Sequence, residues 1–304
     1  MDGVLLIDKP AGLTSHDVVA LLRRSSGERR IGHTGTLDPL ATGLLPLVLG
    51  QATRLSAYLT RGDKTYEATI RLGFSTETDD ALGKPVGAVS ATLPGAAEVD
   101  LALARFRGTF EQMPPQHSAK MVAGRRAYEL ARRDQPVALK PVVVTVRALT
   151  TLGRDGDLLQ LEVTATAGFY VRGLARDLGA ALGCGAHLRA LRRTRSGAFH
   201  IADALAFEEA ERLGPAVAAH VVPPARALPH LPAVTLNAAG LARAVHGNPL
   251  GPGHLEGRPD VMPATGSGVV EPLAQVVRLL ALDGRLVALA EPKAGALHPV
   301  VVLG

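Results

Sequence analysis

The sequence predicts an α+β fold, because strand-like and helix-like segments follow each other without the regular strand–helix alternation of a doubly wound sheet. Segments with alternating apolar and polar residues, typical of strands, occur in several places among segments with helical spacing. A proline-rich stretch at residues 222–232 separates a long first part from a short last part. We therefore expect a large domain over residues 1–228 and a small domain over residues 229–304.

The first predicted elements lie near the N-terminus. Residues 4–7 are apolar and are expected to form a short buried strand that ends at Asp8-Lys9-Pro10. A helix is expected next, because Thr14 can cap it, Asp17 stands three residues later in capping-box spacing, and apolar residues follow.

The middle of the chain contains two alternating segments and one helical one. Alternation predicts strands over residues 66–72 and 158–167, and the spacing of Val171, Leu174 and Leu178 predicts a helix over residues 170–182. Residues 83–98 are poor in apolar side chains and are expected to form a loop. In the last part, Asp283-Gly284 lies between apolar runs and predicts a hairpin over residues 278–290.

Composition excludes several classes of protein. The chain has 304 residues, of which 47% are hydrophobic, so a well-packed core is expected rather than disorder. No run of 18 apolar residues occurs, and Asp2, Asp8 and Lys9 interrupt the start, which argues against a membrane span or a signal peptide. The single Cys184 cannot form an internal disulfide. These features predict a soluble cytoplasmic protein with no membrane partner.

Positive charge is clustered along the chain. The net charge is +5, and six arginines face one acid, Asp177, within residues 169–195. A second cluster consists of Arg23, Arg24, Arg29 and Arg30. Such clusters are typical of proteins that bind a polyanion, although a solvated surface remains an alternative.

One carboxylate stands in an unusual loop. Asp38 lies between Gly35 and Gly43 and directly precedes Pro39. A residue before proline is disfavoured in helical conformation, so Asp38 should lie extended on a loop, where it can face a substrate. The alternative is structural, because Asp-Pro is also a common turn starter and Asp a good helix cap.

Residues 32–43, Gly-His-Thr-Gly-Thr-Leu-Asp-Pro-Leu-Ala-Thr-Gly, resemble the active-site signature of the TruB family of tRNA pseudouridine synthases. Further segments resemble the other motifs of this family, namely residues 8–15, 63–68, 76–80, 168–172, 182–188 and 191–197. Residues 284–289 are similar, less closely, to part of a PUA domain, a small RNA-binding β-barrel.

The resemblance implies a fold and an activity. The expected fold is a mixed, largely antiparallel central sheet flanked by helices and loops, followed by a small PUA-like domain. The expected activity is the isomerisation of uridine 55 in the T loop of tRNA to pseudouridine, with the base flipped out of the RNA. The tRNA T arm is the expected partner, without an obligatory protein partner, and no cofactor or metal is expected.

The resemblance also implies roles for individual residues. Asp38 corresponds to the nucleophile, which can attack the ribose C1′, remove a C2′ proton or add to C6 of uracil. Tyr66 matches the residue that stacks on the flipped base and helps to remove the C5 proton. The remaining implied residues are Arg172 beside Asp38, Tyr170 and Leu191 in the pocket wall, and His33, which fills the space that the base vacates.

Arg172 is expected to form an ion pair with Asp38. A buried carboxylate has a raised pKa, and a neighbouring arginine offsets this effect. The alternative is that Arg172 contacts phosphate, as is expected of Arg189, Arg192 and Arg193.

The chain departs from the family pattern at a few positions. Phe169 stands where a small or polar residue is usual, and Glu77 replaces a usual aspartate. His117 stands where an aromatic residue is more frequent, and lysine falls at Lys120 rather than at Met121. These positions belong to the part that resembles the RNA-gripping region of the family.

Other functions are weighed against this one. Cys184-x-x-His187 lacks a second pair of ligands, so no zinc site is expected. An RNA-binding, tRNA-folding protein whose catalysis is secondary remains an alternative, as does a guide-RNA-dependent synthase of the same family.

Overall fold

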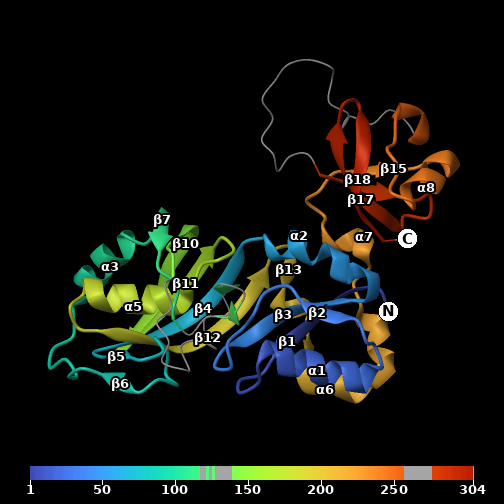
Figure 1. Ribbon diagram of the computed structural model, residues 1–304. Coiled ribbons are helices and arrows are strands. Elements are labelled where there is room, and N and C mark those ends of the chain that lie inside the picture. Colours follow the sequence, from blue (N-terminus) through green and yellow to red (C-terminus); the bar gives the residue numbers. More distant parts are fainter. Residues whose placement is uncertain (117–120, 123–124, 127–138, 257–275, 304) are drawn as a thin grey trace.

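The structure, a computed structural model, describes residues 1–116, 121–122, 125–126, 139–256 and 276–303. Most of these residues form one large sheet with helices packed on it, and the last part forms a smaller sheet (Figure 1). The positions of His117 and Lys120 lie outside the described residues. No helix of the described part is long and apolar enough to cross a membrane.

The main sheet is mixed and largely antiparallel, as the family resemblance implied. In the described residues its strands follow the order β14-β1-β3-β12-β4-β11-β10-β7, with β2 on β3 and β13 on β12. Only the pairs β1/β14 and β3/β12 are parallel among these. The strands are β1 (Gly3–Lys9), β2 (Ile31–His33), β3 (Thr42–Leu49), β4 (Lys64–Leu72), β7 (Gly108–Gln112), β10 (Val142–Asp155), β11 (Leu158–Ala165), β12 (Ala186–Ser196), β13 (Phe199–His200) and β14 (Leu205–Ala206).

Helices cover the sheet at two places. Helix α1 packs against α6, and α5 packs against β12 and β4. The helices are α1 (Ser15–Ser26), η1 (Gly50–Leu55), α2 (Ser56–Thr60), α3 (Ala96–Ala104), α5 (Val171–Ala181), η2 (Ile201–Asp203), α6 (Phe207–Leu213), η3 (Gly214–His220), α7 (Pro224–Ala227), α8 (Ala238–Ala244) and η4 (Pro252–His254).

Local sequence explains the elements around the site. Thr14 caps α1, and the predicted capping box is present: the Asp17 N–H donates to Thr14 Oγ1 (3.0 Å) and the Thr14 N–H to Asp17 Oδ2 (2.9 Å). Strand β4 buries Tyr66, Ala68 and Ile70 on one face, which is the alternation that predicted a strand there. The predicted helix over residues 170–182 is α5, whose apolar side chains are buried in the same core.

The expectation of a loop over residues 83–98 was wrong in part. Residues 83–98 contain β6 (Pro85–Val86), which pairs with β5 (Ser75–Thr76), and the start of α3. Strand β6 is exposed and pairs through its backbone. Helix α3 begins where the Gly95 N–H donates to Glu98 Oε2 (2.6 Å), and it buries Val99 and Leu103 in the core. The proline-rich stretch 222–232 contains α7, and Leu228 beside it is buried.

The last part of the chain forms a sheet of its own. In the described residues its strands are β15 (Ala233–Thr235), β16 (Val277–Leu280), β17 (Leu286–Lys293) and β18 (Ala296–Val302), in that order. The predicted hairpin is confirmed as β16 and β17, and Asp283 Oδ1 accepts the Arg285 N–H at 2.9 Å in its turn. A short two-stranded ribbon, β8 (Met121–Val122) with β9 (Arg125–Arg126), lies between β7 and β10 in the chain.

The two sheets share an apolar cluster. Leu6, Leu44 and Leu55 of the main part are buried together with Leu286 and Leu289 of the small sheet. The Arg54 guanidinium of η1 donates to the backbone carbonyl of Val302. The small sheet is therefore docked on the large one through side chains from both.

Candidate active site

Asp38 lies on the predicted loop between β2 and β3, and its carbonyl accepts the Ala41 N–H (3.0 Å), so Asp38-Pro39 also begins a turn. The loop is fastened to the segment that precedes and begins α1. Ser15 Oγ donates to Leu37 O (3.1 Å) and accepts the Leu37 N–H (2.8 Å), and the Gly12 N–H donates to Pro39 O (2.8 Å). These contacts hold the backbone on both sides of Asp38, so the position of its Cα is fixed.

Arg172 and Asp38 form the predicted ion pair. Arg172 Nε lies 2.9 Å from Asp38 Oδ2, and Arg172 is 5% exposed at the second position of α5. Its Nη1 donates to Thr78 O (3.2 Å) and lies 3.7 Å from Asp80 Oδ2. A guanidinium enclosed by these groups is oriented toward Asp38 and not toward a phosphate on the surface.

Burial around the site raises the pKa of the Asp38 carboxyl above its ordinary value of 3.8. Arg172 and Lys9 oppose this shift, and the like charge of Asp80 adds to it. The side chain is still 37% exposed, which leaves the carboxylate accessible to a substrate. A higher pKa also makes a carboxylate a better base and nucleophile at neutral pH.

The carboxylate opens onto a pocket of about 270 Å³. Five of the six residues that the resemblance implied line this pocket: Asp38, Tyr66, Tyr170, Arg172 and Leu191. The sixth, His33, ends β2 and is absent from the described lining. Phe169, one of the departures from the family pattern, is buried and also lines the pocket, so it reduces the space available there.

Three buried cations lie around the pocket. Lys9 Nζ donates to Pro10 O and Leu13 O, and Lys64 Nζ donates to Thr60 O and Gly62 O, at distances of 2.7–2.8 Å. Burial lowers the pKa of each lysine to about 8. Arg193 is 1% exposed and donates to Leu44 O (2.7 Å) and Gly35 O (3.0 Å).

The expectation that Arg193 contacts phosphate was therefore wrong. Arg193 is the cross-strand partner of Tyr66, so both side chains point to the same face of the sheet, which is the buried one. Burial lowers the pKa of the Arg193 guanidinium, and the neighbouring Tyr66 hydroxyl opposes this shift. Arg193 thus forms part of the wall of the pocket.

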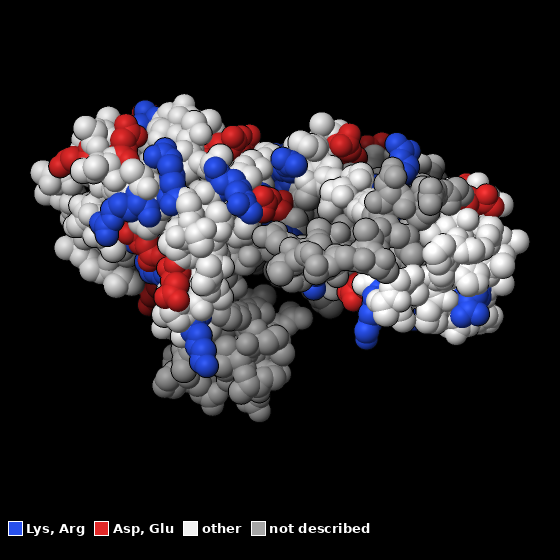
Figure 2. All heavy atoms as spheres, turned by 90° about the horizontal axis from the view of Figure 1, so that it is seen from above, with Lys and Arg blue, Asp and Glu red and all other residues white. Residues whose placement is uncertain are grey.

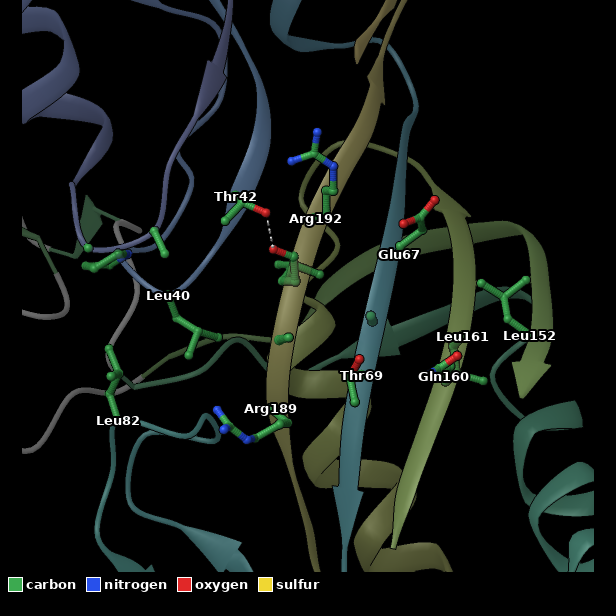
Figure 3. Close-up of a pocket in the computed structure, with 16 residues that line it drawn as sticks. Leu40, Thr42, Glu67, Thr69, Leu82, Leu152, Gln160, Leu161, Arg189 and Arg192 are labelled. Carbon is green, nitrogen blue, oxygen red and sulfur yellow. Dashed lines mark hydrogen bonds between the residues drawn. The ribbon is translucent and has the colours of Figure 1, made fainter. Parts of the chain in front are cut away.

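A larger groove of about 840 Å³ lies elsewhere on the main sheet. Figure 3 shows it on β12, β4 and β11, with α5 passing behind the sheet. Glu67 and Thr69 line this groove, whereas Tyr66, the residue before Glu67, is buried and lines the smaller pocket beside Asp38. The groove is thus the solvent face of an antiparallel sheet, and Asp38 does not line it.

Most arginines of the cluster at residues 169–195 have partners within the protein. Arg192 pairs with Asp8 (2.7 Å), and Arg176 pairs with Asp79 (3.2 Å). Arg189 is exposed at the groove. Over the half of the molecule that holds the main sheet, Figure 2 shows Lys and Arg interspersed with Asp and Glu. These ion pairs reduce the number of arginines that are available to bind phosphate groups.

Sequence reasoning missed two contributions to the site. Ser15 and Asp80 both lie in segments that resemble family motifs, but their contacts with Leu37 and Arg172 arise only in the folded chain. In the described ranges, no group of three or more His, Cys, Asp or Glu could hold a metal ion. Cys184 is buried there, and His187 Nδ1 lies 3.1 Å from Phe74 O.

Comparison with known proteins identifies the family of the chain. A model described as "TruB family pseudouridylate synthase (N terminal domain)" matches residues 23–171, and one described as "tRNA pseudouridylate synthase B C-terminal domain" matches residues 172–218. A protein named "tRNA pseudouridine synthase B" from Solibacter usitatus (strain Ellin6076) is 41% identical over all of both chains. The chain belongs to the TruB family of pseudouridylate synthases. It is thus a pseudouridine synthase, an isomerase.

Further relatives and solved structures agree with the TruB family. "tRNA pseudouridine synthase B" from Thermobifida fusca (strain YX) is 44% identical over 99% of this chain and 98% of the relative. A solved structure titled "Structure of H/ACA RNP bound to a substrate RNA containing 2'-deoxyuridine" is 25% identical, with a TM-score of 0.71 over 99% of this chain and 85% of that chain. A structure of the "archaeal box H/ACA sRNP Nop10-Cbf5 complex" has the same TM-score and identity. The fold is therefore that of pseudouridine synthases.

Proposed function

We propose that this TruB-family enzyme converts uridine 55 in the T loop of tRNA to pseudouridine, with Asp38 as the nucleophile. The observation that carries the proposal is the Asp38 carboxylate held 2.9 Å from the buried Arg172 guanidinium, at a pocket that Tyr66 and Tyr170 also line. The names of the relatives, which specify tRNA, support tRNA as the substrate. A cytoplasmic location is part of the proposal, because it fits a tRNA substrate.

The reaction needs few groups. The bond between ribose C1′ and uracil N1 breaks, the base turns, a bond forms between C1′ and C5, and the proton on C5 leaves while N1 gains one. An ionised Asp38 supplies the nucleophile, and Arg172 keeps it charged and oriented. We assign to Tyr66, which lines the pocket, stacking on the uracil and a part in the removal of the C5 proton. Tyr170 and Leu191 bound the space for the base, and His33, outside the pocket, is left to support the RNA from which the base has turned.

The decisive experiment measures tritium release from C5-labelled uridine in an unmodified tRNA transcript. Wild type should release tritium, and Asp38→Asn, which keeps the shape and loses the charge, should not. Thermal unfolding and tRNA binding of Asp38→Asn should match wild type. If Asp38→Asn instead lost tRNA binding together with its fold, Asp38 would be a structural residue and the proposal would fail.

The same experiment separates the two alternatives. Tritium release from an isolated T-arm RNA, with no guide RNA or partner protein, supports a stand-alone enzyme. Release only when a guide RNA is added would favour a guide-dependent synthase. Tight tRNA binding without release by wild type would favour an RNA-folding protein, and the exposed Arg189 would then be the first residue to vary.

The domain division is a proposal as well. We infer that residues 1–228 carry catalysis and that residues 229–304 form a PUA-like RNA-binding domain. The four-stranded sheet of the last part, with its own buried cluster around Leu279 and Val287, supports this division.

A further inference from the structure

Gln112, at the end of edge strand β7, is a buried amide with a specific partner. The residue is 1% exposed, and a primary amide that leaves water without hydrogen bonds is costly. Its partner is the backbone of Tyr170, 58 residues further along the chain. Gln112 Nε2 donates to Tyr170 O (3.0 Å), and Gln112 Oε1 accepts the Tyr170 N–H (2.8 Å). The amide thus binds both polar groups of one residue.

Tyr170 is the residue from which α5 begins. It is the N-cap, in extended conformation, and its own side chain makes no cap hydrogen bond. Its carbonyl also accepts the Leu174 N–H (3.0 Å), the first hydrogen bond of the helix. Gln112 therefore fixes the point at which the extended chain turns into α5.

Gly173 makes room for this contact. A Cβ at this position would lie 3.0 Å from Gln112 Nε2 and 3.2 Å from its Cδ. Glycine in a helix costs about 1 kcal/mol relative to alanine, so a packing reason for it is expected. The close approach of the Gln112 amide supplies that reason.

Arg172 lies between Tyr170 and Gly173 in the chain, in the first turn of α5. Its guanidinium must reach Asp38 at 2.9 Å and Thr78 O at 3.2 Å at the same time. One turn later, Arg176 Nη2 donates to Met113 O (2.8 Å), so two successive residues of the β7 end hold the first turns of α5. A shift of the helix start would move the Arg172 side chain with it.

We propose that Gln112 is a positioning residue for the isomerisation, which sets the Arg172–Asp38 geometry through the N-terminus of α5. Gln112 is absent from the described lining of the pocket, so it acts through Tyr170 and Arg172 rather than on the substrate. The proposal rests on the proposed roles of Asp38 and Arg172.

The test compares Gln112→Met, which keeps the length and loses both hydrogen bonds, with Glu111→Met on the exposed neighbouring position of β7. Gln112→Met should lower the single-turnover rate with bound tRNA about tenfold to a hundredfold, because small misplacements of catalytic groups cost that much. The tRNA dissociation constant should stay within about threefold of that of wild type, because the buried Gln112 does not line the pocket. Glu111→Met should behave as wild type.

The pH dependence distinguishes positioning from general stability. When Arg172 is held less firmly, burial and Asp80 act on Asp38 with less opposition, while Lys9 stays in place. The acid limb of the rate profile should therefore move to higher pH in Gln112→Met. A purely structural role would lower the melting temperature and leave both the limb and the rate unchanged well below that temperature. Such a result would overturn the proposal.

A second pair of variants covers the case in which Gln112→Met does not fold. Gly173→Ala pushes a methyl group against the amide and should slow the reaction, although alanine favours the helix. The double variant Gln112→Ala/Gly173→Ala should be no slower than Gln112→Ala alone, because the methyl group then has room. If the rate losses of Gln112→Ala and Gly173→Ala were additive in the double variant, the proposal would be overturned. Turnover by Asp38→Asn would overturn the proposed function itself, whereas inactive Asp38→Asn with a normal Gln112→Met would overturn only the positioning role.

Discussion

Arg172 reaches acceptors on two sides with two different nitrogens. Its Nε faces Asp38, and its Nη1 faces Thr78 O and the Asp80 carboxylate. A guanidinium can do this because its donors are fixed in one plane, whereas an ammonium is a single point of charge. The orientation of the Asp38 carboxylate therefore depends on the shape of the arginine as well as on its charge.

Arg172→Lys should slow single-turnover pseudouridine formation by about a hundredfold or more, since one nitrogen cannot serve both sides and the carboxylate loses its fixed orientation. Affinity for tRNA should change little, because the side chain is buried. Arg212→Lys, on an exposed side chain of α6 that lies 3.9 Å from Glu209, is the control and should be mild. Equal rates for Arg172→Lys and wild type would exclude the two-sided role of the guanidinium.

The rate should also depend on pH through Asp38. Because burial raises the pKa of this carboxyl above 3.8, the carboxylate gains its proton at a higher pH than an exposed aspartate does. As the pH falls, the single-turnover rate should therefore drop with a midpoint above 3.8. The profile is measured with a folded-state control at each pH. A midpoint at or below 3.8 would show that Arg172 and Lys9 outweigh burial.

At the scale of elements, β3 and β12 approach each other at Gly43. A Cβ there would lie 2.4 Å from Arg193 O and 2.7 Å from Arg193 N, and φ is +98°. Glycine is thus required both by the backbone angle and by the neighbouring strand. Since the parallel pair β3/β12 joins the Asp38 loop to the Leu191 wall of the pocket, this contact determines how the two halves of the site meet.

Gly43→Ala should therefore lose more stability than Gly12→Ala. Gly12 has a similar φ of +90°, but no heavy atom of the described residues lies within 4 Å of the point that a Cβ would occupy there. Backbone strain of about 1–2 kcal/mol applies to both substitutions, and overpacking of about 1–3 kcal/mol adds only to Gly43→Ala. Urea unfolding measures the difference. Equal losses of unfolding free energy in the two variants would mean that β3 and β12 can move apart at Gly43 without a loss of stability.

Prediction from sequence succeeded where local chemistry decides the structure. The capping box of α1, the apolar spacing of α5 and the Asp-Gly turn of the last hairpin are all local signals. Tertiary contacts were not accessible in this way: no local pattern brings Gln112 to Tyr170 or Ser15 to Leu37. The burial of Arg193 could have been predicted, because in a strand it shares the face of Leu191 and not that of Arg192.

At the scale of the whole molecule, the two sheets share an apolar cluster in addition to the core that each has of its own. Leu44 and Val48 of β3 are completely buried, in a cluster that Leu286, Leu289 and Leu303 of the small sheet help to form. Arg278 of β16 also donates to Ala225 O (2.7 Å) and Leu231 O (2.9 Å) in the proline-rich stretch. The stretch is therefore fastened along its length and does not act as a free linker.

Removal of residues 229–304 should consequently lower stability as well as RNA affinity. The truncated chain would expose the apolar face of β3, so its melting temperature should fall by several degrees and it should bind a hydrophobic dye. With tRNA bound and below the melting temperature, the chemical step should slow less than the affinity falls. Calorimetry of both chains is the measurement. An unchanged melting temperature would show that the shared cluster contributes nothing.

The burial of Lys9 and Lys64 has a consequence for the uptake and release of protons during folding. Lys9 and Lys64 have a pKa of about 8 in the folded chain and 10.5 when exposed, so unfolding between these pH values takes up protons from the buffer. The contribution of each lysine to the free energy of unfolding therefore rises with pH across this window and is constant below it. The measured heat of unfolding at pH 9 should depend on the ionisation enthalpy of the buffer. This dependence should be weaker in Lys64→Met, which has lost one of the two lysines. The folded protein is, at these two positions, a weaker base than its own unfolded chain.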